Sequence, residues 1–245
     1  MTQYFCKPCI YLAASSALHI FADVNNKNLD IMEHSNIYHL IILDESGSMT
    51  TIDRQAVGGL NETLGGIRSA SREKPGQNHF VSIVSFEGDG VKGVKTIRDR
   101  VPIEKVENIT MEEYHPGACT PLYDAMGVSL TRLENLIGKD DLALITIITD
   151  GMENSSEEWS GKAVKALVGR LREKGWTFAY IGANQDAVEV ARELDIRNAL
   201  NFDATPEGTD EMSSVLTEST VMFCMRPIAC MADRSDFFVR KPKKK

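Results

Sequence analysis

The sequence predicts an α/β fold built on a mainly parallel, doubly wound sheet with helices on both faces. The first observation is that apolar runs of strand length alternate with amphipathic, helix-length segments along most of the 245-residue chain. The second is the run at 142–149, which is almost uniformly apolar, as is typical of a strand buried on both faces inside a parallel sheet. The length suits one sizeable domain with some excess at the ends.

The first half of this pattern begins with a strand at 37–43. Residues 52–71 repeat apolar side chains at three- and four-residue spacing, which predicts a helix that ends before Pro75 and Gly76. The run at 80–86 predicts a second strand. The more polar run at 94–101 predicts an edge strand, paired as a hairpin with the strand before it.

In the second half, Pro121 suits the first turn of a helix, with Thr120 as its N-cap and Gly138 at its end. The remaining expected elements are a strand at 142–149, a helix at 157–174, a strand at 176–181, a short helix at 186–194, a strand at 199–202 and a closing helix at 209–216. No usable period continues beyond residue 217. We therefore expect an N-terminal extension at 1–35, one domain at 36–217 and a C-terminal extension with a basic tail at 218–245.

The status of the N-terminal extension stays open on sequence alone. Residues 10–22 are moderately apolar but interrupted by polar side chains, which argues against a cleaved signal peptide without removing it as an alternative. Translation from Met32 is a second alternative, since this residue lies five positions before the first strand.

Charge and cysteine usage exclude several classes of protein. The net charge of −8 argues against a general nucleic-acid binder, and the basic residues at 240–245 are expected to be a solvated tail. Cys6 and Cys9 form a Cys-x-x-Cys pair without the second pair that zinc needs, and the five cysteines form no disulfide framework. We expect reduced thiols in a cytoplasmic protein, and no segment is apolar enough to span a membrane.

Candidate metal ligands follow the first strand directly. Asp44, Ser46 and Ser48 alternate along an extended segment, so their side chains point the same way, and Gly47 lets the backbone turn. One carboxylate and two hydroxyls form a hard, all-oxygen donor set that suits Mg²⁺ or Mn²⁺ better than zinc. In isolation the same string also suits an ordinary turn.

Two further oxygens are expected at the same edge of the sheet. Asp150 ends the central apolar strand, and Thr120 starts a helix on the same side. Sites in doubly wound sheets form outside the carboxyl ends of the strands, where neighbouring carboxylates repel unless a cation lies between them. Taken singly, Thr120 reads as a helix cap, Asp150 as a turn residue and Cys119 as a packing residue.

These motifs resemble the von Willebrand factor A (vWA) domain with its metal-ion-dependent adhesion site. The resemblance rests on Asp44-x-Ser46-x-Ser48, on Thr120 in a Gly-x-x-Thr-Pro-Leu stretch and on Asp150 in Ile-Thr-Asp-Gly, and it covers 36–217. It implies a Rossmann-like sheet of about six strands with one antiparallel edge strand. It also implies Mg²⁺ held by the two serines and the threonine, with one or both aspartates acting directly or through water.

The resemblance implies a binding module of the bacterial intracellular type rather than an enzyme. The ion would offer an open coordination position to a carboxylate of a partner protein. Candidate residues for the rim flank the ligands in sequence: Glu45, Glu113, His115 and Glu153. The alternative for each of them is a solvated loop residue without a role in binding.

Two alternatives remain. One is a Mg²⁺-dependent phosphatase or phosphotransferase, although the second Asp that dehalogenase-type phosphatases need is replaced by Ser46 and no phosphate loop is present. The other is a regulatory domain switched through its last helix.

Overall fold

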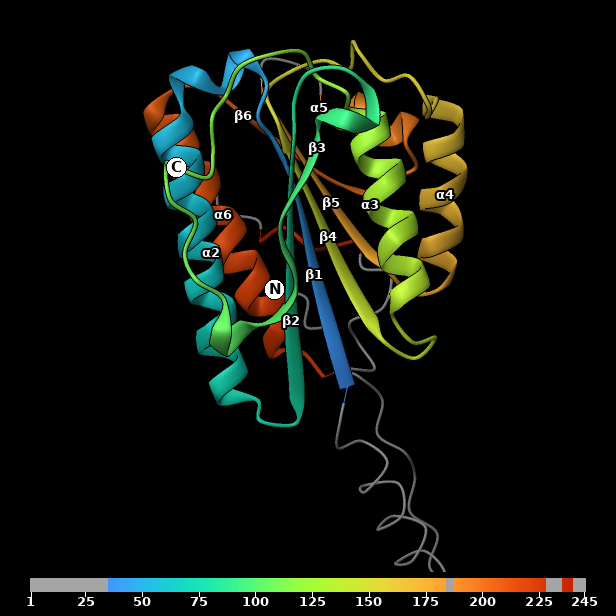
Figure 1. The fold of residues 1–245 in the computed structure, drawn as a ribbon. Coiled ribbons are helices and arrows are strands. Elements are labelled where there is room, and N and C mark those ends of the chain that lie inside the picture. The colour runs from blue at the N-terminus through green and yellow to red at the C-terminus, as the bar shows by residue number, and fades with distance from the viewer. Residues whose placement is uncertain (1–34, 184–186, 228–234, 240–245) are drawn as a thin grey trace, which may run out of the picture. The chain divides into compact units, whose positions relative to one another are not determined.

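The computed structural model describes residues 35–183, 187–227 and 235–239 (Figure 1). The described chain forms a six-stranded sheet in the order β3-β2-β1-β4-β5-β6. Its strands are β1 (Ser35–Asp44), β2 (Gln77–Phe86), β3 (Val94–Pro102), β4 (Leu142–Thr149), β5 (Thr177–Ala183) and β6 (Asn198–Phe202). The expected extension at 1–35 and the basic tail lie almost entirely outside the described residues.

The sheet topology confirms the predicted fold class. Every pair of neighbouring strands is parallel except β2 and β3, which are antiparallel and interrupted by register shifts. The sheet is wound outwards in both directions from β1 and β4, which pair directly through Leu43 and Ile148 near their carboxyl ends. Such a reversal of strand order places a site at that edge.

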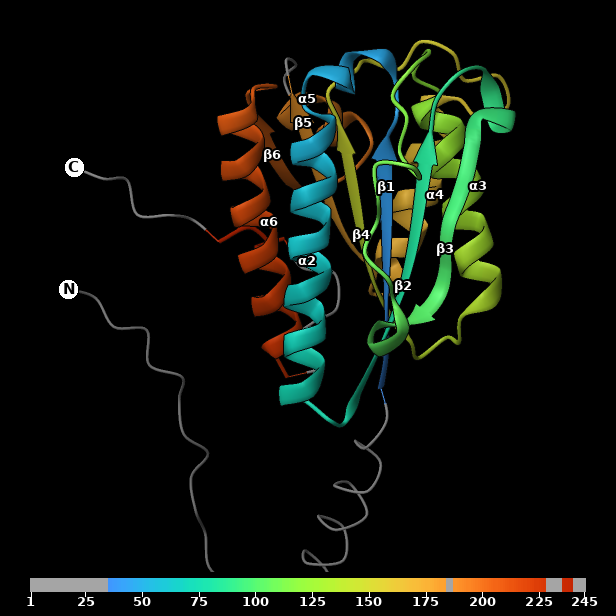
Figure 2. The ribbon, with the colours of Figure 1, turned by 60° about the vertical axis from the view of Figure 1, so that its left-hand side comes forward.

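Helices cover both faces of the sheet. The helices α2 (Asp53–Glu73) and α6 (Pro206–Met225) lie side by side on one face, as Figure 2 shows. The other face carries α3 (Leu122–Leu136), α4 (Gly161–Glu173) and α5 (Ala187–Glu193). Short 3₁₀ turns occur at Gly47–Thr51, Gly90–Gly93 and Ile103–Lys105.

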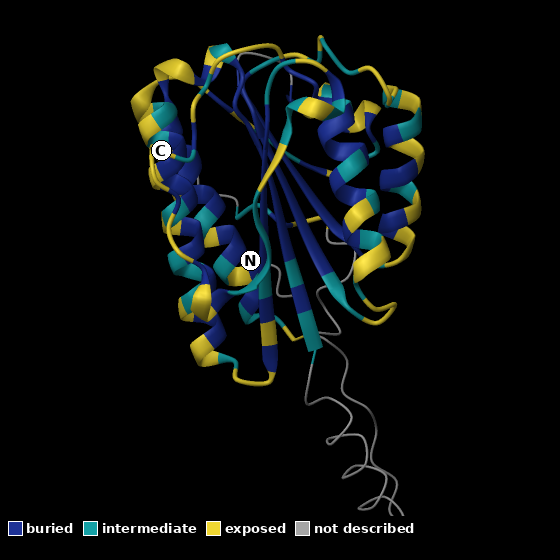
Figure 3. Ribbon diagram, viewed as in Figure 1, coloured by how far each residue is buried: buried dark blue, intermediate teal, exposed yellow. Residues whose placement is uncertain are grey.

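The alternation of side chains along β1 divides the core into two clusters. Ile37 and Ile41 point to the cluster under α2 and α6, whereas Leu40 and Ile42 point to the cluster under α3 and α4. Both faces of the central strands are therefore buried, and the exposed residues lie mainly on the outer sides of the helices, in the loops and on the edge strand β3 (Figure 3). Among the described helices, none has the length and hydropathy needed to cross a membrane.

Close packing joins α2 to α6. A Cβ atom added to Gly59 would lie 1.8 Å from Ser213 Oγ, and one added to Gly66 would lie 2.8 Å from Val221 Cγ2. The Thr63 and Thr217 hydroxyls lie 3.1 Å apart in the same interface. These α2 positions share one helix face, so glycine there lets the two helices approach closely.

Two element boundaries differ from the sequence expectation. α4 begins at Gly161 rather than at 157 because the buried carboxylate of Asp124 accepts hydrogen bonds from the backbone N–H groups of residues 157–159, which holds that segment as a loop. α6 extends to Met225, so the domain boundary expected after residue 217 falls inside this helix. Its last turns bury Ser219 and Thr220 beside Phe223, and this mixture of polar and apolar buried residues hides the helical period.

Candidate metal centre

The carboxyl edge of the two central strands brings the predicted oxygen donors together. Asp44 is the last residue of β1, and Asp150 directly follows β4, the strand that pairs with β1. Asp44, Ser46, Thr120 and Asp150 are buried, whereas Ser48 is exposed. The cluster is thus set into the sheet edge and reaches the surface at Ser48.

Hydrogen bonds link the Asp-x-Ser-x-Ser string to Asp150. The backbone N–H of Ser46 donates to Asp44 Oδ1 at 2.7 Å, which turns the chain back over the strand end. The hydroxyls of Ser46 and Ser48 lie 3.2 Å apart, and Ser48 Oγ donates to Asp150 Oδ1 at 2.6 Å. The alternation predicted from sequence therefore places these donors on one side of the turn.

The position of Gly151 shows that Thr120 belongs to the same cluster. A Cβ atom added to this glycine would lie 2.8 Å from Thr120 Oγ1, 3.3 Å from Asp44 Oδ2 and 3.4 Å from Ser46 Oγ. Three oxygens from two separate segments therefore surround one point beside Gly151, and the absence of a side chain at residue 151 leaves that point free.

The predicted N-cap role of Thr120 is wrong. Pro121 occupies the cap position of α3, without a side-chain cap. The first N–H groups of the helix instead donate to the 153–156 loop, from Tyr123 to Glu153 Oε2 at 2.8 Å and from Asp124 to Ser156 Oγ at 3.0 Å. Because that loop caps the helix, the Thr120 hydroxyl is free to face the carboxylates.

Burial makes the two carboxylates costly to ionise. Burial raises the pKa of Asp44 to about 6, and the nearby charge of Asp150 adds to this rise, although hydrogen bonds from Thr149 and Ser46 oppose it. Burial also raises the pKa of Asp150, against the hydrogen bond from Ser48. Two buried carboxylates facing hydroxyls at one point form a set of oxygen donors that a hard cation stabilises in the ionised form.

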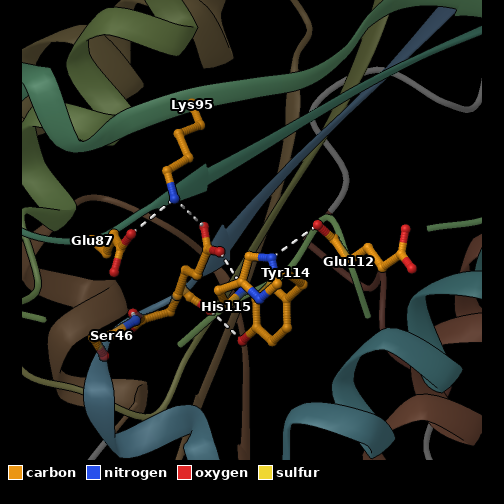
Figure 4. Close-up of polar contacts among 8 residues, drawn as sticks. Ser46, Glu87, Lys95, Glu112, Tyr114 and His115 are labelled. Carbon is orange, nitrogen blue, oxygen red and sulfur yellow. Dashed lines mark hydrogen bonds and ion pairs between the residues drawn. The ribbon is translucent and has the colours of Figure 1, made fainter. Parts of the chain in front are cut away.

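Glu45, one of the residues predicted for the rim, lies beneath the site. Its side chain is fully buried, and Oε1 accepts the backbone N–H of His115 at 2.5 Å. Its other oxygen lies 3.5 Å from Lys95 Nζ, which also binds Glu87 at 2.8 Å. Figure 4 shows Lys95 directed at Glu87, with Tyr114 and His115 close by. The glutamate therefore anchors the loop at His115 from inside and is not exposed at the surface.

The other three rim candidates occupy different environments. Glu113 pairs with Arg98 on β3 at 2.7 Å. His115 is exposed, and its ring nitrogen Nε2 lies 2.9 Å from the backbone oxygen of Glu112. Glu153 is half-buried and is used to cap α3. His115 is the rim candidate whose side chain is most accessible.

Sequence reasoning did not assign roles to two residues that support the cluster. Thr149 Oγ1 donates to Asp44 Oδ2 at 2.5 Å, and the buried Tyr114 hydroxyl donates to the backbone oxygen of Asp44 at 2.6 Å. Thr149 was recognisable as the residue before Asp150 in the motif. Tyr114 lies 70 positions from Asp44, and nothing in its surroundings in the sequence indicates this contact.

The loops around the cluster are joined by backbone hydrogen bonds. Gly47 N donates to Ala118 O at 3.0 Å, and Gly117 N donates to Glu45 O at 2.9 Å. A Cβ atom on Gly47 would lie 2.8 Å from Gly117 O, so the two loops touch at their backbones. Cys119, expected to be a packing residue, is exposed, and its backbone oxygen accepts from Gly88 N at 3.0 Å. The donor positions are thus fixed by a connected set of loops.

Comparison with known proteins gives no match to a protein-family model and no match to a curated protein sequence. Solved structures do match. The vWA protein from Catenulispora acidiphila aligns with a TM-score of 0.53 and 16% identity over 78% of this chain and 43% of its own. The VWA domain of SpRpn10 aligns with a TM-score of 0.51 and 10% identity over 78% of this chain and 95% of its own. The fold is vWA-like.

A larger protein shares the same fold. The pilus adhesin SpaC from Lactobacillus rhamnosus GG, in its open conformation, aligns with a TM-score of 0.58 and 10% identity over 76% of this chain and 30% of its own. This chain therefore spans less than half of the length of SpaC and of the Catenulispora protein. At these identities the likeness concerns the fold, and function has to be argued from the site.

Proposed function

We propose that this chain is a Mg²⁺-dependent protein-binding module, with a metal-ion-dependent adhesion site formed by Asp44, Ser46, Ser48, Thr120 and Asp150. The observation that carries the proposal is the convergence of Thr120 Oγ1, Asp44 Oδ2 and Ser46 Oγ around the point that Gly151 leaves free. Oxygen donors of this kind suit Mg²⁺, and Mn²⁺ is the alternative ion with the same donor preference.

Each side chain has a distinct part in this proposal. The two serines and Thr120 supply neutral hydroxyl oxygens, which leave the charge of the ion largely uncompensated. Asp44 and Asp150 supply the negative charge, directly or through water. A bound Mg²⁺ would then offer its remaining coordination position to a carboxylate of a partner protein.

The surface around the cluster suits contact with a protein. Ser48 opens the cluster to solvent, and Met152, only two residues after Asp150, is 71% exposed. A flexible apolar side chain beside a charged site offers adaptable contact area. With the exposed imidazole of His115, it would give selectivity among partners that all present a carboxylate.

A binding module is favoured over an enzyme by the surroundings of Asp44. Its two carboxylate oxygens accept from the Ser46 N–H and the Thr149 hydroxyl, and the position of a second acid is occupied by Ser46, whose hydroxyl faces Ser48. Within the described residues, no histidine forms a hydrogen bond with the side chain of Asp44 or Ser46. Cytoplasmic placement and the bacterial intracellular type remain predictions from the sequence.

Affinity capture tests the proposal most simply. The wild-type protein and Asp44→Ala are each incubated with extract in Mg²⁺ and in EDTA, and bound proteins are quantified. We expect a set of proteins retained only by the wild type in Mg²⁺. The matched control is Gly58→Ala, an exposed α2 position with open space around it, which should retain the same set. Identical sets in all conditions would refute an adhesion site, and robust phosphatase turnover abolished by Asp44→Asn would refute the binding-module reading.

A further inference from the structure

A second cluster of metal-ligating side chains lies inside the core, away from the carboxyl edge. It consists of His39 on β1, His79 on β2 and Cys224 in the last turn of α6, all buried. His39 Nε2 lies 3.0 Å from His79 Nδ1, and Cys224 Sγ lies 3.9 Å from the same nitrogen. The three donor atoms all lie within 4.8 Å of one another.

The hydrogen bonds inside this cluster leave one buried nitrogen without a partner. The two imidazole rings are stacked with centroids 5.3 Å apart, and His79 Nε2 is buried without a hydrogen-bond partner. His79 Nε2 is not one of the converging atoms, because His79 Nδ1 makes the short contacts to His39 and Cys224. An ion held by Nδ1 would leave Nε2 as the N–H of a neutral ring.

The separations of the donors are close to those of ligands around one metal ion. For a metal–nitrogen distance of about 2.05 Å and a metal–sulfur distance of about 2.3 Å, the 120° angles of a three-ligand centre place two nitrogens about 3.6 Å apart and nitrogen and sulfur about 3.8 Å apart. The observed 3.0 Å and 3.9 Å differ from these values by about 0.6 Å and about 0.1 Å, and the third pair of donors lies within 4.8 Å. Side-chain movements of about 1 Å bring the atoms to one centre.

The surroundings of the cluster decide which ion it suits. It lies in the core between the sheet and α2 and α6, among residues such as Ile37, Val81 and Phe223. Among the residues that the structure describes, the group contains no fourth histidine, cysteine or carboxylate. A net charge in such a core is costly unless it is compensated.

We propose that His39, His79 and Cys224 form a three-ligand site for Cu(I). Two neutral imidazoles, one thiolate and a monovalent ion form an uncharged unit, whereas Zn²⁺ with the same ligands leaves one positive charge. Structural zinc sites also take four ligands, and thiolate with imidazole suits soft or borderline ions. This inference does not depend on the function proposed for the oxygen cluster.

The protonation states of the free cluster agree with this assignment. Burial lowers the pKa of His39 well below its usual range and lowers that of His79 to about 4, so both imidazoles are neutral at pH 7, as ligation requires. Burial raises the pKa of Cys224 to about 12, so the thiol keeps its proton until a cation replaces it. Binding therefore releases one proton from the Cys224 thiol.

An occupied site would tie three segments of the fold together. Cys224 is the penultimate residue of α6, and the two histidines belong to neighbouring strands. The ion would therefore fix the end of α6 against β1 and β2. Because such an ion binds only the folded chain, it stabilises that chain in proportion to its occupancy.

The test uses a chain in which Cys224 is the only thiol, with Cys6, Cys9, Cys119 and Cys230 replaced by serine. The matched control retains only the exposed Cys119 and carries Cys224→Ser. Both are titrated anaerobically with Cu(I) against a competing chelator. We expect one equivalent in the Cys224 chain, at least about 100-fold tighter than in the control, with one sulfur and two nitrogen ligands in X-ray absorption. At free Cu(I) about 100-fold above Kd, the midpoint of thermal unfolding should rise by about 5 °C or more.

The Cys224 chain is also titrated with Zn²⁺. Its His39→Phe and His79→Leu variants are titrated with Cu(I). Retention of Cu(I) in a folded His39→Phe or His79→Leu chain would overturn the site. Equal Cu(I) affinity in the two single-thiol chains, or an X-ray absorption spectrum without nitrogen ligands, would do the same. Tight binding of Zn²⁺ without binding of Cu(I) would overturn the choice of ion.

Discussion

The oxygen cluster at the carboxyl edge and the His39–His79–Cys224 cluster in the core are the two candidate metal sites of the described chain. The strand β1 contributes to both, through Asp44 and His39, whose side chains lie on opposite faces about 17 Å apart along the strand. The oxygen cluster is exposed at Ser48 and held by loop hydrogen bonds, whereas the core cluster is buried and leaves His79 Nε2 unpaired. Hard donors thus lie near solvent, and soft donors lie where charge has to be balanced internally.

The largest expected effect is that a substitution in either cluster weakens binding of one ion and leaves binding of the other unchanged. Asp44→Ala should weaken Mn²⁺ binding at least about 100-fold while leaving Cu(I) binding unchanged, because it removes an oxygen donor without touching the core. Cys224→Ala should have the reverse effect. Isothermal titration calorimetry on the two variants gives both affinities. Loss of both ions in either variant would mean that the sites are not independent.

The two clusters differ in how well they could be predicted from the sequence. Asp44, Ser46 and Ser48 are adjacent in sequence, and the strand pattern indicated that Asp150 and Thr120 lie at the same edge, so the oxygen cluster could be predicted. The core histidines lie 40 positions apart and Cys224 lies 145 positions from His79, with no motif to link them. The strand register and the last turn of α6 bring them together. The sequence pattern predicts that this helix ends at residue 216, before Cys224.

The fold shows the same division between local and long-range information. The order of strands and helices follows from apolar periodicity, a local property. The cap of α3 and the start of α4 depend on contacts from Glu153 and Asp124 across 30 or more positions, and these boundaries were mispredicted. Helix termini respond to whichever groups satisfy their free N–H groups, and those groups need not be neighbours in sequence.

Filling the space among the oxygen donors should give the second largest effect. Gly151→Ala places a methyl group 2.8 Å from Thr120 Oγ1 without changing any donor, so Mn²⁺ affinity should fall about 10- to 100-fold. Manganese electron paramagnetic resonance measures the free ion directly. Gly58→Ala is the control, since its Cβ meets nothing within 4 Å. Unchanged affinity in Gly151→Ala would show that the ion does not bind at this point.

Lowering the pH should reduce the folding stability of the metal-free protein through the core cluster. The pKa of His79 is lowered to about 4 in the folded state by burial, whereas an unfolded histidine titrates near 6.5. The unfolded chain therefore binds more protons below pH 6.5, and the folded state loses about 1–3 kcal/mol of stability between pH 6.5 and pH 4. Urea unfolding of the wild type and His79→Leu across this range isolates the contribution. Parallel pH curves for the two proteins would contradict it.

A smaller effect is expected at Lys95, which lies beside the oxygen cluster without entering it. Its ammonium group pairs with the buried Glu45, next to Asp44 in sequence, so its removal makes the surroundings of the site more negative. Lys95→Met should raise Mn²⁺ affinity about two- to fivefold, a modest change because the lysine is half-exposed and screened. Lys92→Met, at an exposed position in the preceding turn, should leave the affinity unchanged. A fall in affinity for Lys95→Met would indicate that this lysine mainly orders the loops.

Anomalous diffraction from crystals soaked with Mn²⁺ tests the central claim most directly, because it locates the ion among the donors. We expect a manganese peak bounded by Asp44, Ser46, Ser48, Thr120 and Asp150, and none at His39, His79 and Cys224. A manganese peak in the core cluster, or a crystal with free access to the sheet edge and no peak there, would contradict it.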